Sequence, residues 1–387
     1  MSIYDFIKKF CTGLIRLNRL IAFLLLCLCA VPGVAGTATL QPEMIRVALL
    51  KGVESVRLDG QSVIATDEEG KLLGLNLPLL VKRSRIGLSV NGRYVRSLVA
   101  TAPDFVLING KRYRGIIEIT PVDKGILVVD ELHLEDYLVG LINCEISSQW
   151  PMESIKSQAV IARSYAIFQR DARKNAPYHL ESSVMDQVYN GCDIEDSRAA
   201  RGVSETAGEV LTFEGRVIQA FYHSNCGGHT DAAENVWGYS LPYLPGVDCK
   251  YCLTASSGKW QQTIPLKKIE SLLKGGTYQV YGLREIRAGG RNKSGRLNEL
   301  LLLTAKGSVP IPAVSFRKLI GYSIIKSTNF EVRTVGDDAF FSGAGYGHGV
   351  GLCQWGAKQR AEDGFDYREI LSYYYPGTRL VKIYSDR

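Results

Sequence analysis

The chain has 387 residues, of which 46% are hydrophobic and 22% are charged, and its formal net charge is +7 at pH 7. This length suffices for one large or two ordinary domains with a buried core, and the composition excludes a largely disordered chain. The basic residues are scattered without a cluster, so the charge does not indicate nucleic-acid binding.

The first 36 residues predict a signal for export. Four basic residues precede a short apolar run over residues 20–31, and small residues follow at 33–36. Cleavage would lower the net charge to +4, because it also removes Asp5. An uncleaved N-terminal membrane anchor is the alternative, although the apolar run is short for a membrane span. We therefore expect an exported protein of the periplasm, the cell wall or the outer face of the membrane.

Residues 40–130 predict a β-rich region. Asn91-Gly92 and Asn109-Gly110 each lie between β-prone runs, which is the pattern of a tight hairpin turn. A third turn, over residues 121–125, separates two further apolar runs. No cluster of catalytic side chains occurs here, so this region is interpreted as a β scaffold or a binding module.

Residues 131–387 predict a mixture of helices and strands. Helices are expected over 134–142, from Pro151 to about 174, and over 197–205, 266–273, 354–362 and 367–374. Strands are expected over 209–213, 217–223, 299–304, 330–335 and 380–384, the first two joined by a Glu214-Gly215 turn. Because helices and strands are segregated rather than alternating, the predicted fold class is α+β.

Glu145 is the first candidate catalytic residue, placed by the sequence at the entrance of the helix that Pro151 opens. Its neighbours Ile142, Ile146 and Trp150 supply apolar surroundings, which disfavour the charged form of a carboxyl and keep it protonated near neutral pH. Such a group can donate a proton to the leaving oxygen of a glycosidic bond. A solvated or helix-capping glutamate is the alternative.

Two later blocks supply candidate substrate-binding residues. In the first, His223 and Ser224 follow a predicted strand, and Gly227 and Gly228 would let backbone amides approach a sugar closely. The alternative for the histidine is a satisfied, half-buried side chain.

The second block contains glycines at every other position from 345 to 351. This spacing predicts a strand with one bare face on which a glycan could lie flat, near His348 and Gly349. Gln354 and Trp355 would then contact the sugar by hydrogen bonding and by stacking. Glycines required for tight packing are the alternative.

The cysteines provide a metal candidate. Cys249 and Cys252 have the spacing of a structural zinc half-site, and Cys226 with His229 would complete a tetrahedral set, with His223 as the alternative fourth ligand. In an exported protein, a disulfide between Cys226 and one of the pair is equally compatible with the sequence.

Two other cysteines lie inside the candidate catalytic blocks. Cys144 and Cys353 are expected to be small, free apolar side chains, and a second disulfide is the alternative. A thiol hydrolase acting through either of them is poorly supported, because neither belongs to the histidine pattern of a thiol nucleophile.

Together these blocks resemble the stage II sporulation protein D / LytB amidase-enhancer family over roughly residues 132–380. The resemblance implies a SpoIID-like domain over 131–387 and Glu145 as the catalytic residue. One departure is that the family's Met-Pro after this glutamate is replaced by Ile146-Ser147, with the proline at Pro151 behind a short insertion.

The activity implied by the sporulation branch is that of a peptidoglycan lytic transglycosylase, in cell-wall remodelling or sporulation. It cleaves glycan strands between MurNAc and GlcNAc and leaves 1,6-anhydro-MurNAc. One glutamate suffices, because the sugar's own 6-hydroxyl attacks the anomeric carbon, and catalysis requires no cofactor. The alternative from the other branch is a non-catalytic, wall-binding enhancer of an N-acetylmuramoyl-L-alanine amidase. The expected partners are glycan strands and, under this alternative, an amidase, with a membrane involved only if the N-terminal segment is uncleaved.

Overall fold

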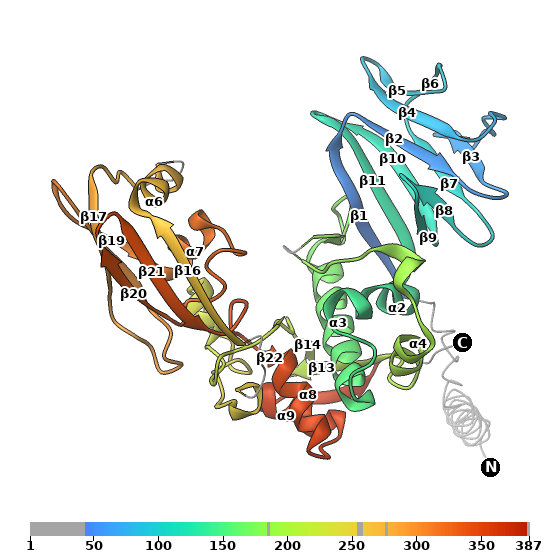
Figure 1. Cartoon of the computed structure of the whole chain (residues 1–387). Coiled ribbons are helices and arrows are strands. Elements are labelled where there is room, and N and C mark those ends of the chain that lie inside the picture. Colours follow the sequence, from blue (N-terminus) through green and yellow to red (C-terminus); the bar gives the residue numbers. More distant parts are fainter. Residues whose placement is uncertain (1–42, 184–185, 254–257, 275–277, 385–387) are drawn as a thin grey trace, which may run out of the picture. The chain divides into compact units, whose positions relative to one another are not determined.

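The computed structural model describes residues 43–183, 186–253, 258–274 and 278–384 (Figure 1). The predicted export signal, residues 1–36, lies outside the described residues. Among those described, no helix combines the length and the hydrophobicity that a membrane span requires. The described residues contain several sheets, built mostly from antiparallel strand pairs, together with helices, which confirms the predicted α+β class.

The β-rich region forms two six-stranded sheets. The first has the order β12-β1-β11-β10-β7-β3 and contains β1 (Met44–Val53), β3 (Ile64–Asp67), β7 (Leu98–Thr101), β10 (Ile116–Val122), β11 (Gly125–His133) and β12 (Leu180–Glu181). The second has the order β6-β5-β4-β2-β8-β9 and contains β2 (Ser55–Asp59), β4 (Leu79–Ser84), β5 (Gly87–Val90), β6 (Arg93–Val95), β8 (Val106–Ile108) and β9 (Lys111–Tyr113).

The predicted hairpin turns are confirmed in these sheets. Asn91-Gly92 joins β5 to β6 and Asn109-Gly110 joins β8 to β9, and all four residues have positive φ, as a tight hairpin turn between twisted strands requires. The turn after Val122 joins β10 to β11.

Two helices contact the first sheet, α2 (Leu134–Glu145) and α3 (Met152–Ala172), and a third, α4 (Ser197–Ser204), packs against these two helices (Figure 1). The division predicted at residue 130 falls inside β11, which runs directly into α2. Buried residues of β1, α2 and α3, such as Ile45, Leu138 and Ala159, belong to one hydrophobic cluster. The strands and the helices that carry the site therefore share a core.

The end of α2 corrects the predicted position of Glu145. The helix continues beyond residue 142 and Glu145 is its last residue, so it ends one helix rather than standing at the entrance of the next. The Ile146 N–H still donates to Ile142 O at 2.9 Å, after which the backbone becomes extended. α3 begins six residues later, with Pro151 at its N-cap, as predicted.

Short strands from distant parts of the chain form the remainder of this region. β13 (Glu209–Phe213) pairs with β14 (Arg216–Val217) and β23 (Arg379–Lys382), whereas β15 (Tyr222–His223) pairs in parallel with β22 (Leu352–Cys353). The strand predicted over 217–223 is thus split between two sheets. The nearby helices are η1 (Gly191–Ile194), α5 (Ala233–Trp237), η2 (Lys250–Cys252), α8 (Gln354–Glu362) and α9 (Tyr367–Tyr374).

Residues 259–344 form a separate hydrophobic cluster built on two three-stranded sheets. Its elements are β16 (Lys259–Pro265), α6 (Leu266–Leu273), β17 (Leu283–Ala288), β18 (Glu299–Thr304), β19 (Gly307–Pro312), α7 (Ala313–Ile320), β20 (Phe330–Val335) and β21 (Asp338–Ala344). α6, β18 and β20 were predicted, and the others were not.

The glycine-rich segment 345–351 is a loop, which corrects the predicted strand. Its four glycines all have positive φ, between 74° and 114°. This is a left-handed conformation that glycine adopts without steric cost and that a strand excludes. The alternating spacing therefore reflects close turns rather than a bare sheet face.

Candidate functional site

Glu145 lies in an open cleft between the end of α2 and the start of α8. The cleft has a volume of about 390 Å³. The residues that line it are Asn143, Cys144, Glu145, Ile146, Ser147, Trp150, Ser224, Gln354 and Trp355. Residues more than 200 positions apart in the sequence thus meet around one carboxyl.

The surroundings of Glu145 favour its protonated form. Burial raises the pKa of its carboxyl, because low-dielectric surroundings disfavour the charge. Three hydrogen bonds act in the opposite direction, from the Tyr222 hydroxyl, the Val188 N–H (3.4 Å) and the Gln354 amide. The net pKa remains above its ordinary value, so the carboxyl can hold a proton and still be stabilised after giving it up.

The Tyr222 hydroxyl is oriented by a short chain of hydrogen bonds. Tyr137 donates to Gln187 Oε1 at 3.0 Å, and Gln187 Nε2 donates to the Tyr222 oxygen at 3.2 Å. The hydroxyl proton of Tyr222 is therefore free to point to Glu145. Burial and the charge of Glu145 raise the pKa of Tyr222 well above its usual range, so this donor stays protonated.

The insertion after Glu145 is fixed by its own hydrogen bonds. Asn143 Oδ1 accepts from the Ser148 N–H at 2.9 Å, and its Nδ2 donates to Asp196 at 2.8 Å. Asp196 also accepts from the Ser148 hydroxyl. Arg198 donates to Ser148 O at 2.7 Å and to Trp150 O at 2.9 Å. These contacts hold residues 146–150 in place beside Glu145.

Two tryptophans form an aromatic wall of the cleft. The rings of Trp150 and Trp355 lie 5.0 Å apart, centroid to centroid, and are tilted by 55°. Lys358 Nζ lies 5.9 Å and 5.3 Å from the two ring centroids. Both rings are partly exposed, so they offer an apolar face beside the carboxyl.

Of the predicted substrate-binding residues, Ser224, Gln354 and Trp355 line the cleft with Glu145. His223 does not, because neighbouring residues of a strand point to opposite faces and Tyr222 takes the face toward Glu145. The buried His223 donates from Nδ1 to Val350 O at 3.1 Å, and burial holds its pKa well below the usual range.

The remaining predicted residues also lie away from the cleft lining. His348 accepts from the Val350 N–H at 3.1 Å, and burial lowers its pKa to about 3, so it stays neutral. Gly227 and Gly228 follow Cys226 directly, and Gly228 O accepts from the Cys249 N–H at 2.8 Å. Gly349 packs against Arg296, whose guanidinium would lie 2.5 Å from a Cβ at this position.

Sequence reasoning missed Tyr222 and Gln187, which connect Glu145 to the core. Tyr222 was visible as the neighbour of His223 in a predicted strand, and the alternation of strand side chains was the signal that only one of the two could face Glu145. Gln187 lies in a segment without periodicity and gave no signal. Trp150 was noted only as an apolar neighbour of Glu145.

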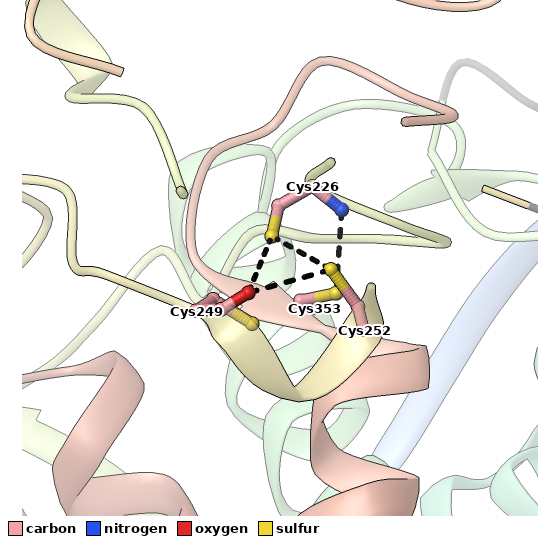
Figure 2. Close-up of side chains that lie close together, drawn as sticks. All are labelled: Cys226, Cys249, Cys252 and Cys353. Atoms are coloured by element: carbon pink, nitrogen blue, oxygen red, sulfur yellow. Dashed lines mark hydrogen bonds between the residues drawn. The ribbon is translucent and has the colours of Figure 1, made fainter. Parts of the chain in front are cut away.

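The structure brings four buried cysteines together: Cys226, Cys249, Cys252 and Cys353 (Figure 2). Their sulfur atoms all lie within 4.8 Å of one another. Cys353 therefore takes the place predicted for His229, whose Nδ1 instead lies 2.6 Å from Thr230 O. The cysteines of the described part of the chain are all free thiols.

Cys144 lies in the cleft beside Glu145, but its surroundings do not activate it. Burial raises the pKa of this thiol, and the charge of Glu145 acts in the same direction. Only the thiolate is an effective nucleophile, so the position suits an inert neighbour.

The fold and the cleft define an α+β protein with a single protonatable carboxyl beside an aromatic wall. The stage II sporulation protein (SpoIID) family matches residues 122–213, which contain Glu145, and a domain of unknown function (DUF8618) matches residues 253–351, which contain the separate β-rich cluster.

Three relatives extend these matches. An uncharacterized protein of Brachyspira hyodysenteriae is 35% identical over 312 residues, which cover 79% of this chain and 83% of the relative. The amidase enhancer of Bacillus subtilis is 29% identical over 63% of this chain but only 40% of its own length. The stage II sporulation protein D of Bacillus amyloliquefaciens is 26% identical over 65% of this chain and 75% of its own length. The chain belongs to the stage II sporulation protein D / amidase-enhancer family.

Proposed function

We propose that the protein is an exported peptidoglycan lytic transglycosylase that cleaves glycan strands between MurNAc and GlcNAc. The observation that carries the proposal is that Glu145 is the only acid among the described residues of the cleft, with a pKa raised by burial. An ordinary glycosidase needs a second carboxylate at the same bond, as nucleophile or as base for water.

The nearby acids have other structural roles. Asp196 caps α4 and accepts from Asn143 and Ser148. Asp186 forms an ion pair with Arg173 at 2.8 Å and accepts from the Glu181 N–H. Neither carboxylate lines the cleft, so the attacking group has to come from the substrate or from solvent without a second acid.

The reaction then needs one carboxyl in two roles. Protonated Glu145 donates its proton to the glycosidic oxygen as the bond from that oxygen to C1 of MurNAc breaks. The 6-hydroxyl of the same MurNAc attacks C1 and transfers its proton to the Glu145 carboxylate. The products are a free 4-hydroxyl on the GlcNAc and a 1,6-anhydro ring on the MurNAc, with no water consumed. Tyr222 and Gln354 stabilise the carboxylate between the two transfers.

The walls of the cleft suit a sugar chain. The partly exposed rings of Trp150 and Trp355 can stack on sugar faces, and Ser224 and Gln354 can hydrogen-bond to hydroxyls. The backbone N–H of Trp355 donates to the backbone carbonyl of Ser224 at 3.1 Å, which fixes these two cleft residues relative to each other. Catalysis requires no cofactor in this scheme.

A non-catalytic enhancer of an N-acetylmuramoyl-L-alanine amidase is the second candidate, and the similarity to the B. subtilis amidase enhancer favours it. In that function the same cleft would bind glycan strands, and an amidase would be a protein partner. Glu145 would then have no chemical role, so the two candidates differ in what its replacement does.

The test is mass spectrometry of glycan strands stripped of stem peptides after incubation with the purified protein. The expected products end in 1,6-anhydro-MurNAc, and Glu145→Gln should abolish them. Glu331→Gln is the matched control, because Glu331 lies in β20 with its side chain 78% exposed. Products with free reducing ends would show attack by water and overturn the transglycosylase proposal. Intact stripped strands, combined with faster release of stem peptides when an amidase acts on whole peptidoglycan in the presence of the protein, would favour the enhancer.

A further inference from the structure

We propose that Cys226, Cys249, Cys252 and Cys353 bind a single Zn²⁺ ion through four thiolates. The four sulfur atoms lie within 4.8 Å of one another, and the Cys226 and Cys252 sulfurs are 3.3 Å apart. A tetrahedral zinc with bonds of about 2.3 Å to sulfur requires about 3.8 Å between sulfurs. The spacing therefore fits one ion at the centre of the cluster. Figure 2 shows the four side chains gathered around this point.

The ligands converge from three separate segments. Cys226 follows β15, Cys249 and Cys252 flank and end η2, and Cys353 ends β22. The tight η2 turn directs both of its sulfurs to the same side, and the Cys249 N–H donates to Gly228 O at 2.8 Å. This convergence of a Cys-x₂-Cys turn with two distant cysteines is the arrangement of a closed structural zinc site.

Donors around the cluster stabilise negative sulfur. The N–H groups of Cys226 and Gly356 each lie 3.3 Å from Cys353 Sγ, which sits at the positive N-terminal end of α8. The Tyr374 hydroxyl lies 3.1 Å from Cys249 Sγ. Groups that hydrogen-bond to metal-binding atoms in this way orient the ligands and increase the affinity of the site for its metal.

A buried arginine supplies the charge that such a site needs. Zn²⁺ with four thiolates has a net charge of −2, which is costly to bury without compensation. Arg296 is fully buried, donates to Cys226 O at 2.8 Å and lies 4.0 Å from Asp231. Its Nε and Nη1 have no hydrogen-bond partner among the described residues. The Asp231 carboxylate alone leaves this guanidinium incompletely paired. The negative charge of the four thiolates would balance the rest of its positive charge.

Two other states of the four cysteines are chemically possible. Tetrahedral sulfur sites also bind iron, and an oxidising compartment favours disulfides. We commit to zinc because it undergoes no redox chemistry and because the four sulfurs leave no open coordination position. The ion is thus structural, and its presence does not depend on any reaction at Glu145.

The first experiment is elemental analysis of the purified full chain by mass spectrometry. About one zinc per chain is expected, with four sulfur neighbours near 2.3 Å in X-ray absorption. Zinc content should fall at least tenfold in Cys353→Ser and remain unchanged in His229→Ala. Cys192→Ser is the matched control, because Cys192 is half-buried and lies outside the cluster.

The outcomes separate the alternatives even if a cysteine variant fails to fold. Zinc bound by three sulfurs and one nitrogen would overturn the assignment of Cys353, as would loss of zinc in His229→Ala. Iron in place of zinc would overturn the identity of the metal. If the purified protein contains no metal and its four thiols become titratable only after reduction, the four cysteines form two disulfides and the zinc site is refuted.

Discussion

Replacing Glu145 by glutamine removes the acidic proton but keeps the size of the side chain. The amide oxygen can still accept from the Val188 N–H and the Tyr222 hydroxyl, so the variant should fold with the same cleft. Any loss of cleavage in Glu145→Gln therefore reports on chemistry rather than on packing.

The expected loss is large. A positioned general acid contributes about 10²- to 10⁴-fold to the rate, which corresponds to about 2.7–5.5 kcal/mol of activation free energy. The upper part of this range is expected here, because in the proposed mechanism the same carboxyl acts as acid and then as base, and the described cleft has no second acid to replace it.

The same substitution should stabilise the folded protein as the pH rises. Because the folded-state pKa of Glu145 is raised, its contribution to stability is complete below the unfolded pKa of about 4.3 and is lost as the pH increases through the folded pKa. Each unit by which the folded pKa exceeds the unfolded pKa corresponds to about 1.4 kcal/mol in the free energy of unfolding. The effect is smaller here because the cleft is open to solvent. Glutamine carries no charge and avoids this cost.

Both effects are measurable on one pair of proteins. Initial rates on glycan strands give the loss of activity, and urea unfolding at pH 4 and pH 8 gives the stability difference. The free energy of unfolding of Glu145→Gln should approach that of the parent at pH 4 and exceed it at pH 8. Full activity in Glu145→Gln, or a stability difference that does not change with pH, would refute the assignment of Glu145 as a buried general acid.

Three further predictions address the cleft and an ion pair between α2 and α3. Tyr222→Phe removes a hydrogen bond that favours the charged carboxylate, so the pKa of Glu145 should rise and the basic limb of the pH–rate profile should move to higher pH; an unchanged limb would mean that the two groups do not interact. Trp355→Ala should weaken binding of glycan strands by about 0.5–1.5 kcal/mol, or about 2- to 12-fold in Kd by fluorescence titration, and equal affinity would exclude stacking on this ring. Arg163→Met should lower the free energy of unfolding by about 3 kcal/mol in urea, because it leaves Glu135, paired with Arg163 at 2.7 Å, without its cation, whereas a change below 1 kcal/mol would show that solvent replaces the pair.

Local structure was predicted well where the signal is local. The Asn-Gly turns, the start of α3 at Pro151 to within one residue, and the helices α6 and α9 depend on neighbours within one or two turns, and each of these predictions is confirmed. The period-two glycines 345–351 were misinterpreted because the same spacing suits either a bare strand face or a series of left-handed turns. Only the tertiary contacts, such as Arg296 packed against Gly349, decide between them.

Non-local pairing explains most of what the sequence could not predict. Tyr222 approaches Glu145 because β15 pairs with β22, about 130 residues later, and no local pattern specifies that partner. The same pairing brings Cys353 close to Cys226. Because no local pattern shows this, the sequence pointed to His229, at the familiar Cys-x₂-His spacing, as the fourth ligand instead of Cys353. Glu145 was selected as the catalytic candidate from its apolar neighbours and from the family resemblance, and this stays a prediction. Its position at the end of α2 was not predicted.

The strand pair β15–β22 connects the cysteine cluster to the cleft. Each strand contributes only two residues, and so short a ladder has little stability of its own. Tyr375 supports it from one side, since its hydroxyl donates to Phe221 O at 2.6 Å and accepts from the Leu352 N–H at 3.2 Å. The four cysteines support it from the other, because Cys353 directly precedes Gln354 and Cys226 lies four residues after Tyr222. Tyr222 and Gln354, the two side chains that stabilise the Glu145 carboxylate, are thus held in place by contacts outside the cleft, and the cleft itself stays open.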